Sequence, residues 1–247
     1  MRVTLVMTNP LLRKLENFER LSTLEKQALL SATNVIATVG ARKVIVQEGD
    51  KPRGAHVIIK GFACRYKILA DGGRQIMDFL IPGDLCDGHL FVLQAMDHSI
   101  GTLSACEIAH IDYKTLLTIT QKHPRITRAL WWATLIDEAI LREWVANVGR
   151  RPADRRVAHL LSELFVRLRA VREAKTNGFD LPVSQIDLAD ATALSTVHIN
   201  RILQKLREKR MLTVERKTIH VKDAAGLMEF AEFNPSYLHL GRNNGSR

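Results

Sequence analysis

The chain has 247 residues, of which 46% are hydrophobic and 25% are charged. This composition is typical of a globular protein and excludes a fibrous or fully disordered chain. Lysine and arginine outnumber aspartate and glutamate by 36 to 26, so the formal net charge is +10. Such an excess indicates a polyanionic partner, either nucleic acid or an acidic membrane surface. No run of about 18 apolar residues is present, and the first ten residues are too short and interrupted for a secretory signal, so we expect a cytoplasmic protein.

The three cysteines, Cys64, Cys86 and Cys106, are far apart and unevenly spaced. An odd number of cysteines without a C-x-x-C motif argues against a disulfide framework and against a structural zinc site. We therefore expect buried free thiols.

The amino-terminal half changes from a helical to a β pattern. Residues 10–33 have helical apolar spacing, and Ser22 followed three residues later by Glu25 predicts a helix start. From residue 35 to residue 111, short β-rich runs alternate with glycine-containing turns, and segment 70–75 (ADGGRQ) predicts a hairpin. This pattern predicts a sandwich or barrel-like β domain.

A long helix is predicted from about residue 124 to residue 148, after a short helix that Pro124 closes. Trp131 and Trp132 widen its apolar surface. Such a helix can pack against the β domain or against a second copy of itself, and we favour a dimer because of the family resemblance described below. The residues near a heptad seam are Ile126, Leu130, Ala133, Ile140 and Trp144.

The carboxy-terminal part is predicted to form a winged helix-turn-helix domain. A helix over 153–174 precedes two short helices, over 183–192 and 195–210, and two short strands follow within 211–223. Helices joined by about three residues have the helix-turn-helix spacing. The last residues, 234–247, show no periodicity, so we expect them to be mobile.

The second short helix has the pattern of a DNA-reading helix. Ser184 and Ser195 are placed as N-caps of the two helices. At 100° per residue, a buried stripe leaves Val197 and Arg201 on the opposite face. An arginine can form two hydrogen bonds to a guanine edge, and a valine can contact a thymine methyl group. The stripe consists of Ile199, Ile202, Leu203 and Leu206.

We predict two sets of DNA contacts from this arrangement. The residues predicted to contact bases are Thr196, Val197, His198, Asn200 and Arg201. The residues predicted to contact the DNA backbone are Ser184, Ser195, Lys205, Arg216 and Lys217, the last two at the tip of the wing.

The chain resembles the Crp/Fnr superfamily of bacterial transcription regulators over residues 15–222. The segments that carry the resemblance are 47–84 in the β domain, and 183–212 and 217–221 in the final domain. The resemblance implies an α+β protein with an antiparallel, jelly-roll-like β-roll sensor domain, a long dimerisation helix and a winged helix-turn-helix. It also implies a homodimer that binds double-stranded DNA at a near-palindromic site and works with RNA polymerase. The implied domains are 1–123, 124–149 and 150–222, followed by a tail over 223–247.

The chain departs from the family pattern in its sensor domain. Members that bind cyclic nucleotides carry a glutamate for the ribose and an arginine for the phosphate, where this chain has His89 and His98. Histidine lacks the permanent two-pronged charge of arginine, so we expect no binding of cAMP in the usual mode. Three cysteines are also too few for an iron–sulfur cluster, which needs about four thiolates. The predicted effector-pocket residues are Gly88, His89, Leu90, His98 and Ser99.

The reading helix also departs from the pattern. Thr196 and Val197 stand where Crp-type members have arginine and glutamate, which implies a different target sequence, whereas Arg201 matches the family's second arginine. Ala193 replaces a common turn glycine, so we expect a turn without positive φ.

We predict no cofactor and no metal, and a protein that is not an enzyme, because no catalytic constellation is visible. A haem, or another small effector, remains an alternative. So does a cupin-like metal enzyme with an accessory DNA-binding domain, and so does a membrane-surface scaffold. The candidate metal or haem ligands are Cys86, His89, His98, His56 and His110.

Overall fold

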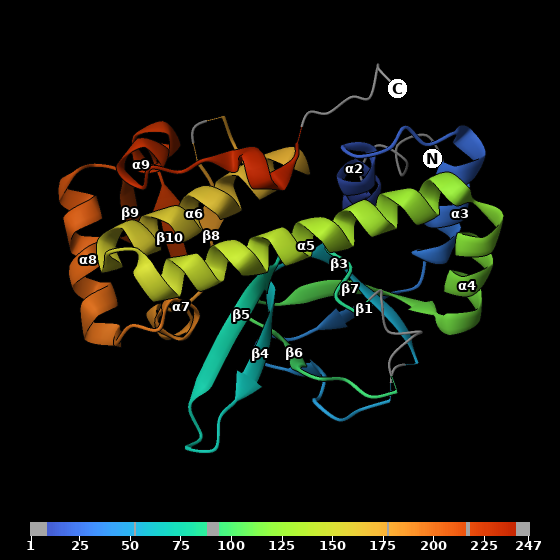
Figure 1. The fold of residues 1–247 in the computed structure, drawn as a ribbon, viewed down its shortest axis with the longest axis horizontal. Helices are drawn as coiled ribbons and strands as arrows, with labels where there is room; N and C mark the ends of the chain where they lie inside the picture. The colour runs from blue at the N-terminus through green and yellow to red at the C-terminus, as the bar shows by residue number, and fades with distance from the viewer. Residues whose placement is uncertain (1–8, 52, 88–93, 177, 216–217, 241–247) are drawn as a thin grey trace. The chain divides into compact units, whose positions relative to one another are not determined.

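The computed structural model describes residues 9–51, 53–87, 94–176, 178–215 and 218–240 (Figure 1). The described chain divides into two compact units. The first contains the residues up to Arg65, Phe79–Glu138 and the residues from His239 onward, and the second contains Tyr66–Asp78 and Ala139–Leu238. Among these residues, no helix combines the length and the apolar character needed to cross a bilayer.

The first unit is a β domain flanked by helices. Its strands belong to a three-stranded sheet in the order β1-β7-β3 and a four-stranded sheet in the order β2-β6-β4-β5, of which β4 and β5 continue into the second unit. The elements are α2 (Pro10–Glu16), α3 (Thr23–Ala32), β1 (Ile36–Val39), β2 (Val44–Val46), β3 (Gly54–Lys60), β4 (Ala63–Ile68), β5 (Arg74–Leu80), β6 (Ser99–Thr102), β7 (Cys106–Asp112), α4 (Tyr113–Lys122) and the first half of α5 (Pro124–Arg150). Side chains from both sheets form one buried cluster that includes Val46, Ile58, Leu80, Ile100 and Ile108. The predicted α+β architecture is confirmed.

Local signals in the β domain correspond to observed contacts. Ser22 and Glu25 form the predicted capping box at the start of α3. The predicted hairpin joins β4 to β5, with the Leu69 amide donating to the Gly73 carbonyl at 2.8 Å. Gly61 has φ of +90°, and a Cβ atom there would lie 2.3 Å from the Ala105 carbonyl oxygen, so this turn requires glycine. All three cysteines are free and buried, as predicted.

The predicted seam of α5 packs against its own chain instead. Ile126, Ala133, Ile140 and Trp144 are all buried in the single chain. A different row of apolar side chains is exposed, and it includes Trp131 (71% exposed). Both faces of α5 are apolar, so periodicity alone could not distinguish the inward face from the outward one.

The second unit is a winged helix-turn-helix domain. Its elements are the second half of α5, α6 (Ala153–Ala170), β8 (Asp180–Leu181), α7 (Gln185–Thr192), α8 (Thr196–Glu208), β9 (Leu212–Glu215), β10 (Thr218–Val221), α9 (Ala224–Phe230) and the 3-10 helix η1 (Pro235–Leu238). The strands form an antiparallel sheet in the order β8-β10-β9. Leu161 and Leu164 of α6 are buried, as are Leu188 of α7 and Leu203 of α8. This small core holds the two short helices in place.

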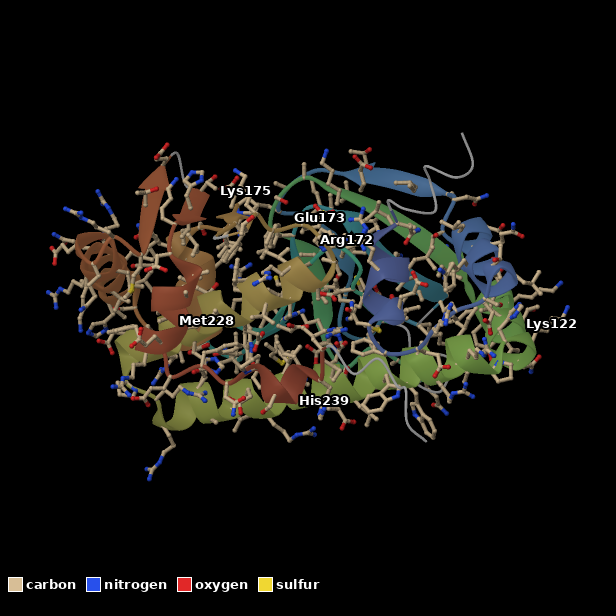
Figure 2. All side chains as sticks on the ribbon, turned by 90° about the horizontal axis from the view of Figure 1, so that it is seen from above. Lys122, Arg172, Glu173, Lys175, Met228 and His239 are labelled. Carbon is tan, nitrogen blue, oxygen red and sulfur yellow. The ribbon has the colours of Figure 1, made fainter. Side chains whose placement is uncertain are left out.

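The expected mobility of residues 234–247 is wrong for the part that the structure describes. Residues 235–238 form η1, Leu238 is buried, and the Tyr237 hydroxyl donates to Glu163 Oε2 at 2.8 Å. In the first unit, the His239 ring lies 6.0 Å from the Trp132 ring, beside α5 (Figure 2). Single apolar and aromatic side chains fix this segment, and such contacts leave no periodic pattern in the sequence.

His159 on α6 is a buried histidine that stays neutral. It is 1% exposed, and its ring packs edge-on against Phe233 at 4.9 Å between centroids. Burial, with a smaller effect from the Arg151 charge, lowers the pKa of His159 from 6.5 to about 4.

Stability is therefore expected to fall when the pH drops below 6.5. The unfolded chain then protonates His159 whereas the folded chain does not, so folding loses about 2 kcal/mol between pH 6.5 and pH 5. Urea denaturation at several pH values measures this slope. His159→Gln should remove that part of the pH dependence, and an unchanged slope in the variant would contradict the assignment.

Candidate nucleic-acid interface

The first helix of the pair, α7, begins at a complete capping box. The Ser184 amide donates to Asp187 Oδ2 at 2.8 Å, and the Asp187 amide donates to Ser184 Oγ at 3.2 Å. Asp187 is fully buried. The predicted N-cap role of Ser184 is confirmed, and this hydroxyl is already engaged within the chain.

The turn between α7 and α8 contains a strained residue. Ala193 has φ of 51° and ψ of 45°, so the expectation that this turn avoids positive φ is wrong. The Leu194 amide donates to the Ala189 carbonyl at 3.2 Å, a closure that needs a left-handed residue at this position. The left-handed conformation costs about 1–2 kcal/mol for a residue with a Cβ atom. The packing of α7 against α8 has to offset that cost.

Helix α8 has the predicted buried stripe. Ser195 caps the helix by accepting a hydrogen bond from the His198 amide at 3.3 Å. The stripe residues, which are all buried, are Ile199, Ile202, Leu203 and Leu206. These contacts fix the rotation of α8 about its axis, so the opposite face is directed outward.

The outward face of α8 carries all five predicted base-contacting residues. Val197 is 60% exposed. Arg201 is exposed and, within the described chain, makes no hydrogen bond or ion pair. The remaining three, also exposed, are Thr196, His198 and Asn200.

The cations near the end of α8 are partly occupied within the chain. Lys205 Nζ pairs with the Asp154 carboxylate, and this hydrogen bond lowers the pKa of Asp154. Lys205 and Lys209 also each place Nζ 5.6 Å from the centre of the Phe230 ring. Lys205 is therefore partly committed to its own domain. Arg216 and Lys217, the predicted wing-tip contacts, lie outside the described residues.

Helix α7 is held by two arginines that the sequence did not suggest. In the second unit, Arg74 donates to Asp187 Oδ1 at 2.7 Å and to Asp190 Oδ2 at 2.8 Å. Arg156 donates to the Thr192 carbonyl at the other end of α7 at 2.8 Å. These contacts span 113 and 36 residues of chain, and no local pattern signals them. They position α7, and through it the turn that leads to α8.

The predicted effector pocket is only partly described, because Gly88, His89 and Leu90 lie outside the described residues. His98 is buried, and its Nδ1 lies 2.6 Å from Asp97 Oδ1. Ser99 Oγ accepts a hydrogen bond from the Glu48 amide at 3.0 Å. Ser99 and the Nδ1 atom of His98 are therefore engaged by their own chain, whereas Nε2 of His98 is buried without a hydrogen-bond partner among the described residues.

The four candidate metal and haem ligands that the structure describes do not form one cluster, and the fifth, His89, lies outside the described residues. Cys86 lies in the apolar core, where burial raises the pKa of its thiol well above 9. His56 and His110 contact each other, and both line a second cavity, which is considered below. Among the described residues, no group of three or more histidine, cysteine, aspartate or glutamate side chains could hold a metal ion.

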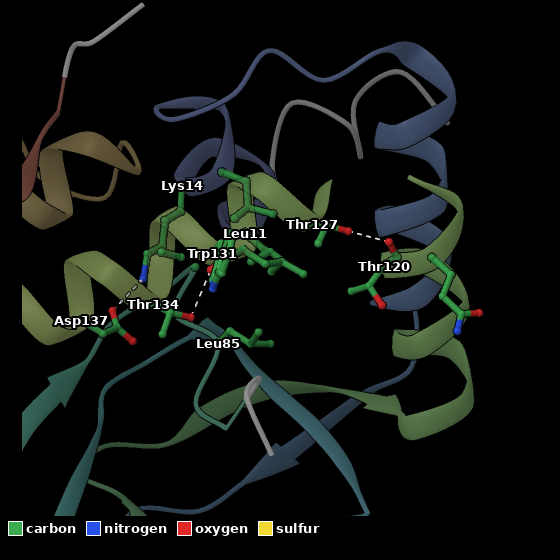
Figure 3. Close-up of a pocket in the computed structure, with 13 residues that line it drawn as sticks. Leu11, Lys14, Leu85, Thr120, Thr127, Trp131, Thr134 and Asp137 are labelled. Carbon is green, nitrogen blue, oxygen red and sulfur yellow. Dashed lines mark hydrogen bonds and ion pairs between the residues drawn. The ribbon is translucent and has the colours of Figure 1, made fainter. Parts of the chain in front are cut away.

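An apolar cavity of about 510 Å³ lies in the first unit among α2, α4 and α5 (Figure 3). Leu11, Leu85 and Trp131 are among its lining residues. At one end, Lys14 Nζ lies 2.8 Å from Asp84 Oδ1 and 3.6 Å from Asp137 Oδ1. His98 and Ser99, the two predicted effector-pocket residues that the structure describes, do not line this cavity.

The fold and the exposed helix define a class: a winged helix-turn-helix DNA-binding protein with an amino-terminal β domain. Residues 37–123 match the cyclic nucleotide-binding domain family, and residues 155–230 match the Crp-like helix-turn-helix domain family. The chain belongs to the Crp/Fnr family of transcription regulators.

Regulators and one solved structure illustrate the similarity. The chain is 27% identical over 213 residues to transcriptional activator protein FnrL of Cereibacter sphaeroides, covering 84% of each chain. It is also 27% identical to nitrogen fixation regulation protein FixK of Bradyrhizobium diazoefficiens, covering 74% of this chain and 76% of the relative. The structure of FixK2 from Bradyrhizobium japonicum aligns with a TM-score of 0.68 at 21% identity, over 79% of this chain and 96% of that one. These relatives are regulators and not enzymes, which supports the non-enzymatic prediction over the cupin-like alternative.

Proposed function

We propose that two copies of this chain bind a near-palindromic DNA site and regulate transcription there, together with RNA polymerase in the cytoplasm. The observation that carries the proposal is the outward face of α8. There, an exposed valine stands one helical turn before an arginine that has no partner in the described chain. An exposed valine gains nothing in water, whereas a thymine methyl group would cover it.

The base contacts follow from the chemistry of that face. Arg201 would donate two hydrogen bonds to a guanine, Val197 would pack on a thymine methyl group, and Asn200 would pair with an adenine edge. Thr196 and His198, near the amino terminus of α8, would reach the adjacent bases or phosphates.

The backbone contacts would come from around this helix. Ser195 lies at the amino terminus of α8, where amide groups favour a phosphate. Ser184, Lys205, Arg216 and Lys217 would add sequence-independent contacts. Because Lys205 already pairs with Asp154, its contribution to affinity should be smaller than that of an unpaired lysine.

Selection of bound duplexes from a random pool tests the proposal directly. Two half-sites about one helical turn apart are expected, and the logarithm of affinity should fall linearly with the logarithm of salt concentration. A protein that binds all duplexes equally, or none, would contradict it.

The proposed dimer would form along the exposed row of α5. The row has the 4-3-4-3 spacing of a two-helix seam. It consists of Trp131, Leu135, Glu138, Arg142 and Val145, so two of its five positions are charged. Three of them, Trp131, Leu135 and Val145, are exposed apolar side chains. A partner helix on this row would cover these three side chains. Because Trp131 lines the apolar cavity, the partner helix would also cover that side of the cavity.

Lysine on this row is expected to separate the two copies. In a symmetric seam, Leu135→Lys brings like charges together, which costs on the order of several kcal/mol and so weakens dimerisation roughly 100-fold or more. Sedimentation velocity over a concentration series measures the shift. Leu24→Lys, at an exposed leucine of α3, is the matched control and should leave the association unchanged. Equal behaviour of the two variants would place the interface elsewhere.

For the effector, we infer that cAMP does not bind in the family's usual mode. His98 is engaged by Asp97, and a histidine cannot reproduce the two-pronged charge of an arginine. Calorimetric titration of cAMP into the purified protein should show no binding at physiological concentrations, and tight binding would overturn the inference.

A further inference from the structure

Two histidines meet on one face of the three-stranded sheet of the first unit. His56 of β3 and His110 of β7 are direct partners in the antiparallel register, so their side chains project from the same face. Their ring centres are 5.0 Å apart, and the rings are tilted by 58°. Both line a cavity of about 540 Å³.

A buried carboxylate fixes one of the two rings. Asp87 Oδ2 lies 2.7 Å from His56 Nδ1, and Asp87 Oδ1 accepts the His56 amide hydrogen at 2.5 Å. Asp87 itself is buried. With Nδ1 facing this carboxylate, a neutral His56 ring presents Nε2 to a ligand.

The other ring is placed by a glycine. A Cβ atom on Gly54 would lie 2.7 Å from Nε2 of His110 and 2.3 Å from the Ile111 carbonyl oxygen. Only the absence of a side chain at residue 54 therefore lets the His110 ring lie where it does. The arrangement of the two imidazoles is built by the strand register, Asp87 and Gly54 together.

The spacing of the rings fits a shared metal ion. Imidazole nitrogens bind zinc at about 2.0–2.1 Å, which at a tetrahedral angle places two ring centres roughly 5 Å apart. At metal sites, a histidine ligand usually donates a hydrogen bond from its other ring nitrogen to a carboxylate or a carbonyl. The separation of 5.0 Å between His56 and His110 agrees with this geometry.

We propose that His56 and His110 chelate one divalent cation of the zinc and copper class, with Asp87 as the positioning residue behind His56. Imidazole ligands favour these metals over magnesium or calcium. The described chain has no third histidine, cysteine or carboxylate placed to complete the set, so water or a small anion would fill the open positions. Asp50, Lys51 and Arg53 also line the cavity, and the two cations would favour an anionic co-ligand.

Titration of the full-length protein with Zn(II) alone, and with Cu(II) alone, tests this site. The native chain should bind one equivalent of metal. Either His56→Gln or His110→Gln should weaken binding at least about tenfold, and Asp87→Asn should weaken it about 10- to 100-fold. His123→Gln removes a histidine of the same unit that does not line the cavity and should change nothing.

Two further readouts keep the test decisive. Electron paramagnetic resonance of the Cu(II) form should show two imidazole nitrogens in the native chain and one in His110→Gln. Since His110 is exposed, this variant should fold normally even if Asp87→Asn does not. If the double variant His56→Gln/His110→Gln binds metal as tightly as His123→Gln, the site does not exist. DNA affinity measured on the same samples reports separately on the function of α8.

Discussion

Replacing Arg201 by alanine is expected to weaken binding to the selected DNA site by about 1–3 kcal/mol, roughly 5- to 150-fold, and to relax the preference at one base pair of each half-site. The cause is the loss of two hydrogen bonds to a base edge from the outward face of α8. Fluorescence anisotropy with the selected duplex and with four duplexes that vary the contacted base pair measures both effects.

Arg207→Ala provides the matched control on the same helix. Arg207 is also exposed, but it lies six residues further along α8, about 240° around the helix axis from Arg201. Its removal should weaken binding to cognate and scrambled duplexes by similar factors, because a phosphate contact carries no sequence information. If Arg201→Ala showed that uniform loss as well, Arg201 would contact phosphates only, and the proposed base contact would be wrong.

Helix α8 could be predicted from sequence because its determinants are local. Ser195 caps an amide three residues away, and the stripe from Ile199 to Leu206 repeats within two helical turns. The left-handed φ of Ala193 is not predicted from sequence, although its cause is also local. The closing bond from Leu194 to Ala189 fixes its φ, and residue identity alone suggested the opposite.

Contacts between distant segments could not be predicted. Arg74 reaches Asp187 across 113 residues. His56 contacts Asp87 because the segment after β5 returns to β3, where the Cys86 amide donates to the His56 carbonyl. The sequence offered His56 and His110 as two of five candidate ligands with no sign of which would meet, and the strand register makes these two neighbours. Local patterns therefore predict the outward face of α8 but not the residues that position this helix.

A buried charge cluster holds the second unit together. Arg167 of α6 donates to Asp78 Oδ1 at 3.1 Å and to Glu163 Oε1 at 3.2 Å, and all three side chains are buried. Trp144 and Tyr237 each donate to Glu163 as well. Burial raises the pKa of Glu163, and burial together with the nearby Glu163 raises the pKa of Tyr237. Arg167 thus pairs with two buried carboxyl groups.

Arg167→Met is expected to destabilise the folded chain by about 3–5 kcal/mol, because it leaves buried charge without its partner. Urea denaturation at pH 7 measures the loss. The deficit should shrink as the pH falls, because removing Arg167 takes away a charge that lowers the pKa of Glu163, so this buried carboxyl group then takes up a proton more readily. An equal deficit at pH 7 and pH 5 would contradict this account.

Two companion variants separate charge from packing. Asp78→Asn/Glu163→Gln/Arg167→Met removes all three charges while keeping similar volumes, so it should recover much of the stability lost in the single variant. Arg128→Met breaks the exposed pair between Arg128 and Glu19 and should leave stability unchanged, because water screens that pair. If the triple variant were as unstable as Arg167→Met, the shape of the Arg167 side chain, and not its charge, would hold α6 against Asp78.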